Sequence, residues 1–120
     1  LSTMLFPREE LTEQDVEAFL EKATNVELQE QLAFNLLAYV PLAIRWAEEV
    51  VLSNATNESR LYVALLTIAN YTKRQPDKPL PEKLTEALEP YVSAEELPMH
   101  CRRVAYDLLI TLEERTASND

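Results

Sequence analysis

The chain contains no glycine in its 120 residues, although average usage of about 7% predicts roughly eight in a chain of this length. Phosphate-binding loops of the GxGxxG and Walker types and the GxSxG nucleophile elbow need glycine for tight turns and for close backbone approach to a ligand. Tight two-residue hairpins also rely on glycine, and no stretch alternates apolar and polar residues over the length of a strand. The sequence therefore predicts an all-α protein with no β-sheet and excludes those motifs.

Length and composition indicate one globular domain. Hydrophobic residues make up 47% of the chain and charged residues 27%, which argues against extended disorder. We expect a single helical domain over 12–116, an N-terminal arm over 1–11 and a frayed tail over 117–120. Because Met4 begins the sequence "MLFPREE", we interpret residues 1–3 as a processing remnant and set them aside.

Apolar residues recur at three- and four-residue spacing through most of the chain, which predicts a compact bundle of five to six helices. Thr12 and Ser93 each precede an acidic residue at the spacing of a capping box, and Asn25 and Asn57 are also placed to cap helices. Pro90 is expected to end the fifth helix. The predicted helices cover 13–24, 26–40, 41–53, 58–73, 81–89 and a last segment that begins near Pro98 and runs to about Arg115.

The longest apolar run, 32–44, has Asn35 as its only strongly polar side chain and carries Pro41 near its end. An interior proline lacks an amide hydrogen and collides with the carbonyl four residues earlier, so this central helix must be bent or broken at Pro41. We favour a break in which Pro41 starts a new helix, because the residue before a proline disfavours the helical conformation.

Three explanations exist for this apolar run. A bilayer span needs about twenty predominantly apolar residues, whereas this run meets Arg45 and then Glu48 and Glu49, so a membrane segment is not expected. A buried core helix is the favoured interpretation, with Trp46 packing inward beside Val50. The alternative is a surface left partly open for a partner or for a second copy of the chain.

Catalytic motifs are weak. His100 is the only histidine and is adjacent to Cys101, but consecutive helical residues point in different directions, so a nucleophile–base pair is geometrically poor. No Glu-x-x-His pair of the di-metal type occurs. We expect no catalysis, no metal and no cofactor, and a buried Cys101 in a stripe with Val104 and Leu108.

Cys101 has no partner in the chain, so no intrachain disulfide is possible and a cytoplasmic location is favoured. Three N-x-S/T patterns, at Asn54, Asn57 and Asn70, would matter only in a secreted chain, and we interpret them as coincidental. The pattern Lys73-x-x-Pro76-x-x-Pro79 fits a polyproline ligand, but such patterns are frequent by chance, and we interpret the prolines as stiffening a connection between two helices.

Charge suggests the class of partner. The net charge is −10, and residues 1–50 hold ten acidic and three basic residues. Such a surface repels phosphate backbones, so direct nucleic-acid binding is not expected. The candidate partner-binding residues are acidic positions on predicted outer faces and two tyrosines: Glu13, Glu17, Glu21, Glu48, Glu49, Tyr62 and Tyr71.

The sequence thus favours a non-catalytic helical protein–protein interaction module, such as an adaptor, assembly factor or regulatory subunit, that self-associates as a homodimer. The alternative is an acidic inhibitor or immunity-type protein that binds a basic partner such as a nuclease.

Overall fold

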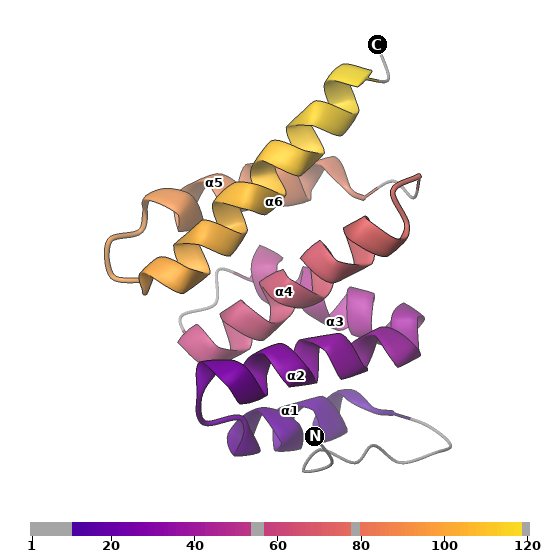
Figure 1. The fold of residues 1–120 in the computed structure, drawn as a ribbon, viewed down its shortest axis with the longest axis vertical. Coiled ribbons are helices and arrows are strands. Elements are labelled where there is room, and N and C mark those ends of the chain that lie inside the picture. Colours follow the sequence, from indigo (N-terminus) through magenta and orange to yellow (C-terminus); the bar gives the residue numbers. More distant parts are fainter. Residues whose placement is uncertain (1–10, 54–56, 78–79, 119–120) are drawn as a thin grey trace.

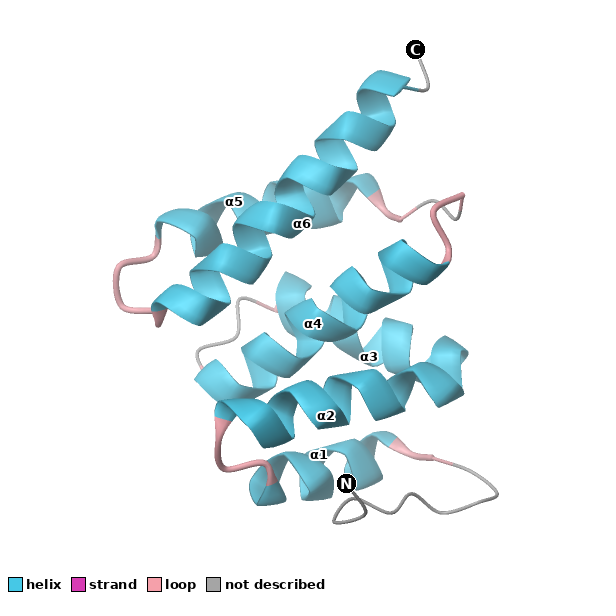
Figure 2. Cartoon of the chain, viewed as in Figure 1, coloured by secondary structure: helices cyan, strands magenta, loops and turns pink. Residues whose placement is uncertain are grey.

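The computed structural model describes residues 11–53, 57–77 and 80–118, in which every regular element is a helix (Figures 1 and 2). This confirms the predicted all-α class. The predictions for residues 1–10 of the expected arm over 1–11, for Asn54, for Pro79 and for residues 119–120 of the expected tail lie outside the described residues. The elements are α1 (Glu13–Lys22), α2 (Val26–Leu36), a 3-10 turn η1 (Leu37–Tyr39), α3 (Val40–Leu52), α4 (Glu58–Arg74), α5 (Glu82–Ser93) and α6 (Met99–Ser118).

Side-chain caps define the starts of three helices as predicted. Thr12 and Asp15 form a complete capping box, in which the Asp15 amide donates to Thr12 Oγ1 at 3.2 Å and the Thr12 amide donates to Asp15 Oδ2 at 2.9 Å. Asn25 caps α2 and Asn57 caps α4, each accepting a backbone N–H three residues later at 2.9 and 3.0 Å respectively. These bonds satisfy amide groups that have no partner within the first helical turn.

The apolar run is broken rather than bent at Pro41. α2 ends at Leu36, η1 follows, and α3 begins at Val40 with Pro41 in its first turn. At that position the missing amide hydrogen costs nothing, because first-turn amides have no intrahelical acceptor. A bend within one continuous helix is therefore not confirmed.

Predictions for the C-terminal third were partly wrong. α5 continues through Pro90 to Ser93, so Pro90 does not end it, and Ser93 Oγ donates to the Pro90 carbonyl at 3.4 Å instead of capping the next helix. Burial of Tyr91 explains the extension, since its hydroxyl donates to the Val51 carbonyl of α3 at 2.7 Å. α6 starts just after Pro98, and the Pro98 carbonyl accepts hydrogen bonds from two amides in the first turn of α6. The helix extends to Ser118, past the predicted end near Arg115.

α4 is the central helix of the bundle. It packs against α2, α3 and α6, while α1 covers α2, and α5 bridges α3 and α6 (Figure 1). The run predicted to be central instead supplies α2 and the start of α3, to one side of α4. The buried residues of α4 lie all around its circumference: Leu61, Tyr62, Val63, Ala64, Leu65, Thr67, Ile68 and Thr72.

Most predicted core positions are confirmed. Cys101 is fully buried and Trp46 is 3% exposed, next to the buried Val50. Gln29 is a buried polar residue that holds three segments together, because its side-chain amide donates to the Ala23 carbonyl at 3.1 Å and to Ser59 Oγ at 3.0 Å. Within the described residues, every fully buried side-chain nitrogen or oxygen atom has a hydrogen-bond partner.

No helix among the described segments is both long enough and apolar enough to cross a bilayer.

Candidate functional site

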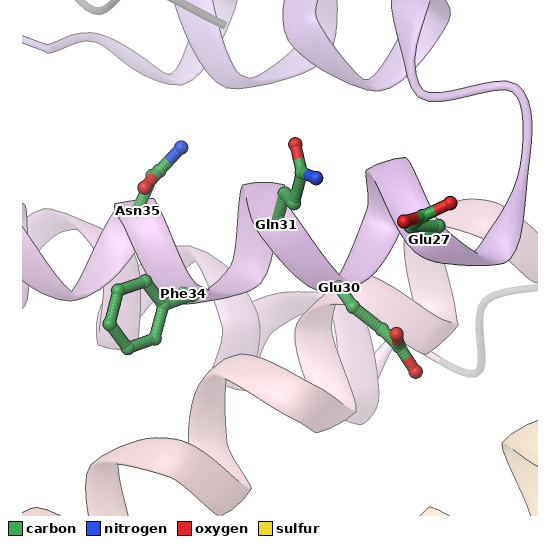
Figure 3. A pocket seen from close by; sticks show the side chains of 5 residues that line it. All are labelled: Glu27, Glu30, Gln31, Phe34 and Asn35. Atoms are coloured by element: carbon green, nitrogen blue, oxygen red, sulfur yellow. The ribbon is translucent and has the colours of Figure 1, made fainter. Parts of the chain in front are cut away.

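A pocket of about 450 Å³ lies on the outer surface of α2. Its lining residues come from positions 27, 30, 31, 34 and 35, which recur with the three- and four-residue spacing of one helical face. Figure 3 shows Gln31 and Asn35 pointing toward α1, and Glu30 and Phe34 pointing toward α4. The α2 pocket is lined by Glu27, Glu30, Gln31, Phe34 and Asn35.

Phe34 is the apolar side chain of the pocket, and it is 57% exposed although its neighbours Ala33 and Leu36 are fully buried. Its ring faces a cation of the same chain, because the Arg74 guanidinium at the end of α4 lies 5.1 Å from the ring centroid. A guanidinium within about 6 Å of an aromatic face is attracted by the ring quadrupole. The exposed ring therefore already has the positive charge of Arg74 beside it.

Glu30 connects the pocket to the interior. The Tyr62 hydroxyl of α4 donates to Glu30 Oε2 at 3.0 Å, and the Tyr62 ring meets the His100 ring of α6 edge-on with centroids 4.6 Å apart. Burial, and to a smaller extent the Glu30 carboxylate, raises the pKa of Tyr62 to about 12. Tyr62 therefore stays protonated at neutral pH and remains a donor that fixes the Glu30 carboxylate.

The predicted acidic residues of α1 differ in their exposure. Glu13 and Glu21 are exposed. Glu17 is half-buried and already engaged, because it forms an ion pair with Arg60 of α4 and accepts from Trp46 Nε1 of α3 at 3.3 Å. Its carboxylate joins three helices, which is a structural role.

On α3, Glu49 is exposed and Glu48 is half-buried. Burial raises the pKa of Glu48, and the positive charge of Lys83 on α5 partly opposes this effect. The predicted acidic residues of α1 and α3 thus lie on two different helices, and none of them lines the α2 pocket.

The two predicted tyrosines differ in accessibility. Tyr62 is only 4% exposed, so the prediction that it is a surface contact is wrong. Its ring is part of the core, and its hydroxyl group holds the Glu30 side chain of the pocket. Tyr71 is half-buried.

Sequence reasoning missed the α2 pocket. Phe34 was available as a signal, because it lies outside the apolar stripes of α2 and shares a face with Glu27 and Glu30. The pattern that indicates such a pocket is an aromatic residue that shares a helical face with acidic residues and not with leucines.

Cys101 and His100 do not form a reactive pair. The Cys101 thiol lies 3.8 Å from the Glu58 carbonyl, and burial, assisted by the Glu58 charge, raises its pKa to about 11. A thiol with this pKa is protonated at neutral pH and is a poor nucleophile. Among the described residues, no group of three or more His, Cys, Asp or Glu side chains is arranged to hold a metal ion.

Two large apolar side chains are exposed on one side of α6. Met99 is 65% exposed and Tyr106, seven residues later on the same side of the helix, is 52% exposed. We call these two residues the α6 stripe.

The fold and these surfaces define the class as an all-α helical bundle. Comparison with protein-family models, with curated proteins and with solved structures gives no match.

Proposed function

We propose that this protein is a non-catalytic interaction module that binds another protein through the α2 pocket. The observation that carries the proposal is the exposure of Phe34 within a pocket whose wall is fixed by the bond between Glu30 and Tyr62. Aromatic residues are enriched in protein–protein interfaces, where a partner can bury them with little loss of conformational entropy. The protonated, buried Cys101 thiol supports a non-catalytic role. Its free state also supports the cytoplasm as the proposed compartment.

The pocket favours a different protein over a second copy of this chain. In a two-fold symmetric dimer each surface meets its own equivalent, so the carboxylates of Glu27 and Glu30 from both copies would come together. Like charges in an interface are unfavourable. The proposed use of the α2 pocket is therefore heterologous binding.

Self-association is a second candidate, and the α6 stripe favours it. Met99 and Tyr106 are exposed on one side of α6, and two antiparallel copies can bury both. This proposal moves the expected homodimer from the central helices to α6.

Matched single substitutions test both proposals. Phe34→Ser and Met99→Ser each remove one exposed apolar side chain, so neither is expected to destabilise the fold strongly. We expect affinity capture from the native source to yield a protein that is retained by Met99→Ser and lost by Phe34→Ser. We expect sedimentation velocity to show concentration-dependent self-association that Met99→Ser weakens and Phe34→Ser does not.

Capture of the same proteins by the wild type and by Phe34→Ser would refute binding at the α2 pocket. A single monomeric species at all protein concentrations would refute self-association.

A further inference from the structure

We infer that the α2 pocket recognises a cationic side chain, foremost arginine, presented by a basic segment of the partner protein. The inference rests on the proposed function and specifies the chemistry of the partner. The arginine would lie against the Phe34 ring, with its guanidinium facing the carboxylates of Glu27 and Glu30.

Charge complementarity supports this partner. The pocket lining combines two exposed carboxylates with two neutral amide side chains and an aromatic ring, and none of its five residues is basic. The whole chain has a net charge of −10, which attracts a basic partner at long range and repels nucleic acid. A second copy of the chain carries the same negative charge and is therefore a poorer ligand.

The spacing of the three side chains suits a guanidinium. Glu27, Glu30 and Phe34 follow one another by three and four residues and line the same pocket. Glu30 accepts one bond from Tyr62, and a carboxylate has about four lone-pair sites, so it retains capacity for further donors. A guanidinium offers five N–H donors and a flat face that stacks on an aromatic ring, whereas an ammonium group offers three donors and no flat face.

The chain itself shows that this ring accepts a guanidinium. Arg74 approaches Phe34 from the end of α4. Arg74 is exposed and is not one of the five residues that line the pocket.

Designed peptides provide the probe. A short amphipathic peptide of alanine and leucine with two arginines one helical turn apart is compared with the same peptide carrying citrulline, which has nearly the same shape but no charge. We expect the arginine peptide to shift the NMR amide signals of residues 27–35. By calorimetry it should bind about tenfold more tightly than the citrulline peptide and more tightly than a lysine version.

Substitutions in the pocket separate local recognition from overall charge. Glu30→Gln keeps an oxygen that can accept from Tyr62, and we expect it to weaken arginine-peptide binding by about three- to tenfold. Glu114→Gln removes an exposed carboxylate on α6, so it changes the net charge equally and should leave the affinity unchanged. Phe34→Leu keeps an apolar side chain but loses the ring face, and we expect a loss of about two- to fivefold.

Several results would overturn the inference. Equal affinity of the arginine and citrulline peptides would show an apolar site without charge recognition, and equal losses in Glu30→Gln and Glu114→Gln would show unspecific charge attraction. The absence of arginine-peptide binding at millimolar concentration would also refute it. None of these results affects the capture experiment with Phe34→Ser, so the proposed function stands or fails independently.

Discussion

Phe34 lies within the apolar run 32–44 and Trp46 lies two residues beyond its end, yet the fold gives these two aromatic residues opposite environments. Trp46 is 3% exposed and its Nε1 donates to Glu17, whereas Phe34 is largely exposed and faces Arg74. Buried tryptophan usually needs a partner for its N–H, and Glu17 supplies one. Aromatic character alone therefore does not separate a core residue from a binding residue.

Trp46 is the only tryptophan, so its fluorescence reports on α3. Because its indole ring is shielded from water, we expect a blue-shifted emission maximum in the native protein and a red shift in denaturant. An emission maximum that denaturant leaves unchanged would show that Trp46 does not lie on the buried face of α3.

The Cys101 thiol is expected to react slowly with thiol reagents, because it is fully buried and its pKa is raised to about 11. Cys101→Ala should lower the free energy of unfolding by about 1–2 kcal/mol, at the modest end of core substitutions. Labelling rates of native and denatured protein, with denaturant unfolding of the variant, measure both effects. Rapid labelling of the native protein would contradict the predicted burial.

At the scale of the element, two prolines show how the position of a proline in a helix decides whether it removes a helical hydrogen bond. Pro41 lies in the first turn of α3, whereas Pro90 lies inside α5. A proline in a first turn removes no intrahelical hydrogen bond, but an interior proline leaves the carbonyl four residues earlier without its amide partner. The helix α5 nevertheless continues past Pro90 because Tyr91 is buried against α3.

Pro41→Ala and Pro90→Ala form a matched pair that tests this difference. We expect Pro41→Ala to change the free energy of unfolding by less than about 1 kcal/mol, partly through a more flexible unfolded chain. Pro90→Ala should raise the free energy of unfolding by about 1 kcal/mol, the net contribution of the one helical hydrogen bond that is restored.

Thermal melts distinguish the outcomes. A loss of more than about 10 °C in Tm for Pro41→Ala would mean that proline itself enforces the break between α2 and α3. A destabilised Pro90→Ala variant would mean that the proline ring makes packing contacts that outweigh the missing bond.

At the scale of the whole molecule, α4 connects most of the other helices. Arg60 pairs with Glu17 of α1, Tyr62 bonds Glu30 of α2, and the same tyrosine ring contacts His100 of α6. The α2 pocket is thus fixed through α4 to the rest of the bundle. A ligand that binds Glu30 therefore meets a preorganised carboxylate.

Two buried groups make stability depend on alkaline pH. The Cys101 pKa is raised from 9.0 to about 11 and the Tyr62 pKa from 10.0 to about 12. Between about pH 9 and 12 the unfolded chain has lost these protons while the folded chain still holds them, so the free energy of unfolding falls as pH rises. Below this range both states bind the protons and these groups contribute no pH dependence.

Denaturant unfolding at a series of pH values measures this effect. We expect Cys101→Ala and Tyr62→Phe each to flatten the alkaline decline. A Tyr106→Phe variant serves as the control, because it removes the same hydroxyl group from a tyrosine that is 52% exposed and not part of the core. An equal flattening by Tyr106→Phe would contradict the assignment to the buried groups.

Local signals in the sequence determined the class of fold and most helix starts. The lack of glycine, the three- and four-residue apolar periodicity and the capping side chains Thr12, Asn25 and Asn57 act within one helical turn, so they can be recognised without knowing the fold. The burial of Cys101 and Trp46 followed from the same periodicity.

Only the tertiary structure decided what lies at the centre and what is left exposed. Packing placed α4 in the middle, extended α5 past Pro90 through the bond from Tyr91 to Val51, and buried Tyr62. It also left Phe34 uncovered beside Glu27 and Glu30, which created the α2 pocket. These outcomes depend on contacts between residues far apart in the chain, and periodicity gives the face of a helix but not the neighbour that covers it.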